Sequence, residues 1–157
     1  MTELKKVRTE HHATQTECAA FLGVSLRSYK DYENNPAKVN SIKYRYMLEQ
    51  LTKYLTITEE RGILQKDFII KTCAKIFPEY NVSYGYLFGS YAKGQARGDS
   101  DVDLLIATCC SGLKFFELVE KLRESLHKKI DLLDVNQLSH NQTLINEILQ
   151  TGEKIYG

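Results

Sequence analysis

The sequence has few of the residues that mark secreted, metal-binding or membrane proteins. Its 157 residues include no tryptophan, two prolines and four cysteines, and no apolar run reaches the roughly 18 residues of a membrane span. The cysteines have no metal-ligand spacing, and the adjacent pair does not suit an ordinary disulfide framework: Cys18, Cys73, Cys109 and Cys110. The opening residues also lack the apolar segment of a signal peptide. We therefore expect a cytoplasmic protein with reduced thiols, no zinc site and no membrane partner.

The chain carries almost no net charge, because 21 Lys and Arg stand against 20 Asp and Glu. This balance excludes a broadly basic nucleic-acid coat and an acidic solvating tail. The composition, 43% hydrophobic and 26% charged, is that of a globular protein. A change of pattern near Ile57 predicts two domains, residues 1–57 with a net charge of +3 and residues 58–157 with −2.

Residues 1–57 are predicted to form short helices. Thr14 and Glu17 have the spacing of a capping box, and Gly23 is a helix stop. Ser25 is predicted to cap a second helix and Ser41 a third. We expect the third helix to turn these residues inward: Ile42, Tyr46, Leu48 and Leu51.

Residues 58–157 mix helices and strands, which predicts an α+β protein overall. One helix is predicted from Thr58, including Ile63, to a stop at Pro78. Strands are predicted at 82–88, 101–106 and 130–135, and helices around 115–126 and 144–149. Four glycines between positions 85 and 98 predict a loop in which the backbone approaches a ligand closely.

Three acidic residues on the predicted strands are candidates for catalysis. Asp101 and Asp103 are two residues apart, so both carboxylates project from one face of a strand. Such a pair can hold Mg²⁺ through oxygen ligands. Asp131 interrupts an apolar strand, where a metal-binding or proton-transfer role would explain a carboxylate.

The segment before this pair is suited to binding phosphate. Gly89 and Ser90 follow a predicted strand, where an exposed N–H group and a hydroxyl can hold a triphosphate. Lys93 and Arg97 add positive charge for the same anion.

The spacing Gly89-Ser90, ten residues, then Asp101-Val102-Asp103 resembles the signature of the minimal nucleotidyltransferase (MNT) family of the DNA polymerase beta superfamily. The resemblance implies a mixed sheet flanked by helices and transfer of NMP from an NTP, with ATP and Mg²⁺ expected here. It implies that Gly89, Ser90 and Lys93 bind the nucleotide. It also implies that Asp101, Asp103 and Asp131 are catalytic metal-binding carboxylates. Lys93 departs from the arginine of many relatives, which loses bidentate phosphate geometry.

Residues 8–56 resemble an Xre/Cro-like helix-turn-helix, through Thr14-Gln15, Leu22-Gly23-Val24-Ser25 and Tyr32-Glu33. The resemblance implies operator DNA as a partner, with these side chains facing it: Gln15, Arg27, Ser28 and Lys30. Because the net charge of +3 is small, specific binding would need a dimer on two half-sites.

Small MNT proteins resemble the antitoxins of HEPN/MNT toxin–antitoxin pairs, which implies AMP transfer to a tyrosine of a HEPN ribonuclease toxin. A catalytic half of about 100 residues leaves little room for an acceptor domain, so the acceptor is expected on a bound partner. Assembly as a homodimer or as a hetero-oligomer with the toxin stays open. Two alternatives also stay open: a small-molecule, aminoglycoside-type nucleotidyltransferase, and a non-catalytic DNA-binding antitoxin or repressor.

Overall fold

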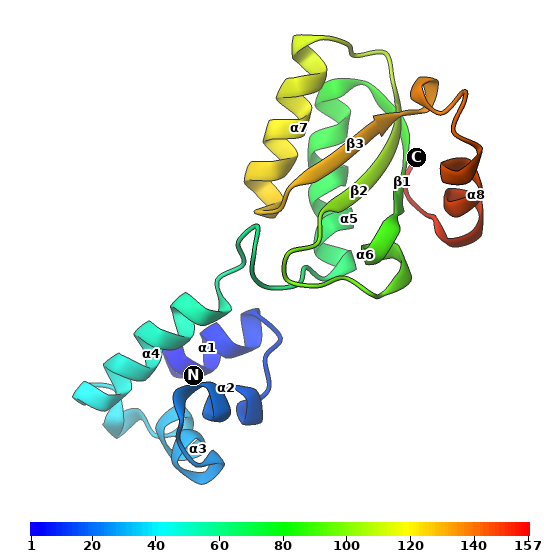
Figure 1. The fold of residues 1–157 in the computed structure, drawn as a ribbon. Coiled ribbons are helices and arrows are strands. Elements are labelled where there is room, and N and C mark those ends of the chain that lie inside the picture. The colour runs from blue at the N-terminus through cyan, green and yellow to red at the C-terminus, as the bar shows by residue number, and fades with distance from the viewer. The chain divides into compact units, whose positions relative to one another are not determined.

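The computed structural model describes residues 1–157 as two compact units, Met1–Thr56 (unit 1) and Ile57–Gly157 (unit 2) (Figure 1). Unit 1 is all helical, and unit 2 contains a four-stranded sheet. No helix in either unit is long and apolar enough to cross a membrane. The expected class, α+β with a mixed sheet flanked by helices, is confirmed.

Unit 1 consists of four α-helices and a short 3-10 turn. Their bounds are α1 Glu3–Glu10, α2 Gln15–Leu22, α3 Leu26–Asn34, η1 Pro36–Lys38 and α4 Ile42–Leu55. The predicted caps are confirmed: Thr14 and Glu17 form a capping box, and Ser25 and Ser41 accept hydrogen bonds from the first turns of α3 and α4. Helix α1, capped by Thr2, was not predicted.

The inward face of α4 differs from the prediction. Leu51 is buried and Leu48 packs partly buried against the same core, as predicted. Ile42 and Tyr46, however, are 87% and 59% exposed, and Tyr44 and Met47 are buried instead. The hydroxyl of Tyr44 accepts a hydrogen bond from the Leu4 N–H at 3.0 Å, so packing against α1 decides which face turns inward. Both faces of α4 carry apolar residues, and periodicity alone does not distinguish them.

Unit 2 has the sheet order β3-β2-β1-β4. Strand β1 is Val82–Phe88, β2 Val102–Thr108, β3 Ile130–Asp134 and β4 Glu153–Tyr156. Strand β1 pairs antiparallel with β2 and β4, and β2 pairs parallel with β3. Two helices precede the sheet, α5 Lys66–Ile76 and η2 Phe77–Tyr80. The others connect its strands: α6 Gly89–Lys93, α7 Leu113–Leu126, η3 Val135–Gln137 and α8 Gln142–Thr151.

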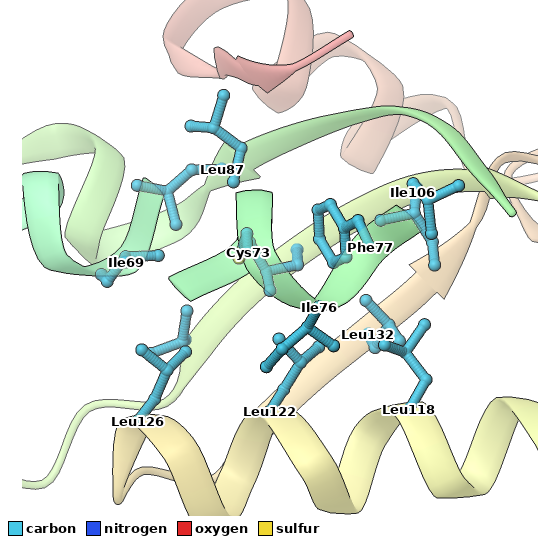
Figure 2. Packing of buried hydrophobic residues seen from close by; sticks show 14 of the residues in the cluster. Ile69, Cys73, Ile76, Phe77, Leu87, Ile106, Leu118, Leu122, Leu126 and Leu132 are labelled. Carbon is cyan, nitrogen blue, oxygen red and sulfur yellow. The ribbon is translucent and has the colours of Figure 1, made fainter. Parts of the chain in front are cut away.

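The two faces of the sheet are covered differently. Helices α5 and α7 cover one face of the sheet (Figure 2). Their buried side chains pack on strand residues that point to this face, such as Leu87 of β1, Ile106 of β2 and Leu132 of β3. The opposite face carries a smaller cluster of Phe88, Leu105 and Ile148, the last from α8. Because strand side chains alternate between faces, Asp103 and Asp131 lie on this second face. The thin cover on this side leaves the acids accessible.

Three predicted details of unit 2 are corrected. Residues 58–65 are not helical, because Thr58 and Arg61 close a turn and Gly62 has a φ of +82°; the helix begins at Lys66. Gly85 lies within β1 and not in a loop. A Cβ at this position of the strand would lie 3.1 Å from the Phe77 ring. Strand β4 was not predicted as a strand.

Candidate active site

The site is built where β1 ends and β2 begins. Phe88, the last residue of β1, pairs with Asp103 on β2, so the next residue, Gly89, is brought against the Asp103 carboxylate. Gly89 has a φ of +69°, and a Cβ there would lie 2.8 Å from Asp103 Cγ. Only glycine satisfies both constraints. Two parts of the sequence signature, separated by thirteen residues, are therefore in direct contact.

The three predicted catalytic acids influence one another electrostatically. Asp103 on β2 pairs with Asp131 on the parallel strand β3, and Asp101 immediately precedes β2. Burial, and then the charges of Asp131, Asp101 and Glu147, raise the pKa of Asp103 to about 6. A half-buried carboxylate such as that of Asp103, repelled by neighbouring carboxylates, is costly unless a cation or a proton joins them.

This donor set fits a hard divalent cation such as Mg²⁺, because all its ligand atoms are carboxylate oxygens and their repulsion would be relieved by positive charge. The side chains do not form a closed group of three metal ligands, however. Mg²⁺ usually completes its coordination with water and substrate phosphates, and an incomplete protein cage is consistent with that habit.

Helix α6 supplies the predicted phosphate-binding residues. Gly89 and the half-buried Ser90 open this five-residue helix, and its buried Tyr91 accepts a hydrogen bond from the Leu64 N–H at 3.4 Å. Lys93 ends the helix, and its Nζ donates to Glu147 Oε1 of α8 at 2.8 Å.

Lys93 is thus partnered by a carboxylate that the sequence reasoning missed. Glu147 lies 54 residues further along the chain, and its spacing gives no signal that connects it with Asp103 or Lys93. Its presence adds a third negative charge, after those of Asp131 and Asp101, to the surroundings of Asp103.

The structure places the four predicted DNA-facing residues on α2 and α3. Arg27 and Lys30 are exposed on α3, and Ser28 is half-buried, with its N–H donating to Ser25 Oγ. Gln15 differs, because its side-chain amide donates to Glu33 Oε1 at 2.8 Å inside unit 1.

Comparisons with known proteins identify a family and several relatives. A model of the family "Polymerase beta, Nucleotidyltransferase" matches residues 71–157. The chain is 30% identical over 96 residues to the protein adenylyltransferase MntA of Shewanella oneidensis, covering 60% of this chain and 66% of that protein. It is 33% identical over 75 residues to a putative protein adenylyltransferase of Methanocaldococcus jannaschii, covering 46% of this chain and 87% of that protein.

One solved structure that resembles the chain is a crystal structure of a toxin–antitoxin with AMP-PNP. It has 28% sequence identity and a TM-score of 0.48, and the match covers 60% of this chain and 74% of that chain.

The family match and the sequence relatives define the chain as a nucleotidyltransferase. The mixed sheet, in which Gly89 is packed on the paired acids, agrees with this class. Because the family model matches more than half of its residues, the chain belongs to the Polymerase beta nucleotidyltransferase family.

Proposed function

We propose that the chain is an Mg²⁺-dependent protein adenylyltransferase that transfers AMP from ATP to a tyrosine hydroxyl of a HEPN ribonuclease toxin and so acts as its antitoxin. The observation that carries this proposal is the convergence of Asp101, Asp103 and Asp131 beside Gly89. The names of the two relatives above, a protein adenylyltransferase and a putative protein adenylyltransferase, support AMP as the transferred group and a protein as the acceptor.

In this proposal each residue has a defined task. Asp101, Asp103 and Asp131 hold Mg²⁺, which when bound supplies positive charge to the α-phosphate. The Gly89 N–H and the Ser90 hydroxyl bind the triphosphate. Asp131, exposed on β3, accepts the tyrosine proton as the tyrosine oxygen bonds to the α-phosphorus and the bond to pyrophosphate breaks.

The decisive experiment uses ATP labelled at either the α- or the γ-phosphate, with the product of the neighbouring gene as acceptor. We expect label from the α position only, on tyrosine. The double variant Asp101→Asn, Asp103→Asn should lose at least about 100-fold in rate, since even outer partners of metal ligands are worth 10–100-fold. Asp67→Asn, an exposed aspartate on α5, is the matched control and should keep full activity.

Three other outcomes would overturn this assignment. Label arriving from the γ position contradicts nucleotidyl transfer. Labelling of an aminoglycoside without any protein partner would establish the small-molecule alternative. Protection of cells by the double variant, equal to that by the wild type, would establish a non-catalytic antitoxin.

We also propose that unit 1 is an Xre/Cro-like helix-turn-helix that binds operator DNA as a dimer for autoregulation. Helix α2, the short turn with Gly23 at a φ of +65°, and α3 with exposed Arg27 and Lys30 support this role. Ser28 on α3 and Gln15 at the start of α2 complete the proposed contact surface.

Binding to a duplex from the region upstream of the gene, followed by fluorescence anisotropy, tests this role. Arg27→Ala with Lys30→Ala should weaken binding and lower the salt slope by about 2, since each lost phosphate contact removes roughly 0.9. Lys6→Ala, also an exposed cation of unit 1, should leave the slope unchanged. Equal slopes for both variants would reject α3 as the DNA-binding helix.

A further inference from the structure

Lys128 is a buried lysine whose ammonium has no carboxylate partner. Its side chain is 0% exposed, although lysine is rarely buried without an ion pair. The ammonium donates hydrogen bonds to two backbone carbonyls, those of Gly98 and, at 3.2 Å, Arg61. Burial lowers the pKa of Lys128, and only the more distant charges of Asp99 and Glu59 oppose that shift.

The first carbonyl belongs to the turn that precedes the acidic pair. Within this turn the Arg97 N–H donates to Ser100 Oγ at 2.8 Å, and the Ser100 N–H donates to the Arg97 carbonyl at 3.1 Å. A Cβ on Gly98 would lie 3.3 Å from the Gly62 nitrogen, so the turn is packed against the segment before α5.

The second carbonyl belongs to that same segment. The Arg61 carbonyl also accepts a hydrogen bond from the Thr58 N–H at 2.9 Å, which closes the turn at residues 58–61. One ammonium therefore joins two loops whose backbones already lie against each other. Lysine suits this place because its ammonium offers three donors and no acceptor.

The backbone beside Lys128 holds the other side of Asp101. The carbonyl of Lys129 accepts a hydrogen bond from the Val102 N–H at 2.9 Å, and the β2–β3 ladder then pairs Val102 with Ile130. Asp101 thus lies between two residues whose backbones are hydrogen-bonded to residues 128–129. The Gly98 carbonyl accepts from the Lys128 ammonium, and the Val102 N–H donates to the Lys129 carbonyl. Strand β3, which carries Asp131, begins directly after residues 128–129, so the spacing of the acids depends on this one junction.

We propose that Lys128 is a positioning residue that fixes Asp101 relative to Asp103 and Asp131 and thereby sets the affinity of the site for a divalent cation. The inference rests on the proposed function, because it takes Asp101 to be a metal ligand. Lys128 contacts neither nucleotide nor metal in this account, and acts through the 97–101 turn.

The experiment compares the full-length variants Lys128→Met, Lys128→Arg and Lys129→Met. Lys129 is the exposed neighbour whose carbonyl, and not its side chain, takes part, so Lys129→Met is the matched control. Two measurements are made: Mn²⁺ binding, from the electron paramagnetic resonance signal of free Mn²⁺, and amide hydrogen exchange.

We expect Lys128→Met to weaken Mn²⁺ binding roughly tenfold, the scale of outer-shell substitutions at metal sites. Exchange should accelerate in residues 97–101 and stay unchanged in unit 1. Adding Lys128→Met to Asp101→Asn should weaken binding no further, because the ligand that Lys128 positions is already lost. Lys128→Arg, which keeps donors for both carbonyls, should restore most of the affinity and keeps the test open if Lys128→Met does not fold.

Two results would overturn the role of Lys128: unchanged exchange at 97–101, or wild-type Mn²⁺ binding by Lys128→Met when Asp101→Asn binds weakly. Unchanged Mn²⁺ binding by Asp101→Asn would instead reject the metal assignment in the proposed function. The exchange data would then decide on their own whether Lys128 holds the turn.

Discussion

Each unit of the chain buries a carboxylate, and the two environments are opposite in kind. Glu33 in unit 1 is fully buried and accepts hydrogen bonds from Arg8 Nε at 2.7 Å, from Arg8 Nη2 at 3.0 Å and from Gln15. Burial alone would raise the pKa of Glu33, but these hydrogen bonds and the charge of Arg8 bring it below its ordinary value. Asp103 in unit 2 is surrounded by acids, and its pKa is raised to about 6.

The two carboxylates differ in whether their oxygens remain available to a ligand. A buried acid whose oxygens already accept hydrogen bonds from neighbouring side chains stabilises a fold and has no capacity left for a ligand. A half-buried acid among like charges is destabilising in the absence of a cation, which is the arrangement expected of a binding site. The pKa values of the two carboxyls accordingly shift in opposite directions, downward for Glu33 and upward for Asp103.

The largest expected effect on stability is in unit 1. Glu33→Ala should lower the free energy of unfolding by about 3–5 kcal/mol, because it leaves the Arg8 guanidinium without its buried partner. Chemical denaturation followed by circular dichroism measures this loss. Glu49→Ala, which breaks the exposed i,i+4 pair with Lys53, is the control and should cost less than about 0.5 kcal/mol.

The pH dependence of the Glu33 effect follows from its lowered pKa. The contribution of Glu33 should be fully present above its unfolded pKa, near 4.5, and should be lost as the pH falls through the lower folded value. A difference between wild type and Glu33→Ala that stayed constant down to pH 2 would contradict the assigned pairing.

An intermediate effect of opposite sign is expected at Asp103. Asp103→Asn should stabilise the cation-free protein at pH 7 by about 1 kcal/mol, since one pKa unit corresponds to about 1.4 kcal/mol and partial exposure screens the repulsion. The gain should vanish toward pH 4. There the raised pKa keeps the wild-type carboxyl protonated in the folded state, and the repulsion is absent.

Thermal unfolding in a chelating buffer, compared between pH 4 and pH 7, measures the difference between this variant and the wild type. The stability that the wild type has below pH 4 is lost as the pH rises through about 6. Destabilisation by Asp103→Asn at pH 7 would show that Asp103 is a structural acid like Glu33.

The smallest effect is expected at the pair between Lys93 and Glu147. Both side chains are about one-third exposed, so Glu147→Gln should change stability by less than about 1 kcal/mol. Because it removes a negative charge near Asp103 and releases Lys93 for phosphate, it should lower the KM for ATP a few-fold. It should also move the acidic limb of the kcat/KM profile to lower pH. A raised KM with an unmoved limb would instead mean that Glu147 holds Lys93 in its working position.

Much of this structure could be predicted from local patterns. Alternation predicted β2, and Thr14, Ser25 and Ser41 predicted three helix starts, because caps and strand periods depend on residues a few positions apart. The spacing of Gly89, Ser90, Asp101 and Asp103 predicted the family to which the chain belongs.

Two of the failed predictions depended on contacts between distant segments, and the third on a local turn. The inward face of α4 is set by the bond of Tyr44 to Leu4, forty positions away. Strand β4 is four residues long, too short for a clear alternation, and forms because β1 offers an open edge. The turn at residues 58–61 interrupts a spacing that looked helical, because the backbone at Gly62 takes a positive φ.

By itself, then, the sequence predicted which residues carry the chemistry, since the residue types and spacings of Gly89, Asp101 and Asp103 are properties of the chain alone. Only the tertiary structure decided how those residues are held and charged. It brought Asp131 beside Asp103, Glu147 beside Lys93, and the Lys128 ammonium under the turn before Asp101. The reason is physical: electrostatic repulsion and hydrogen bonding depend on distance in space, and the folded backbone, not the order of residues, sets that distance.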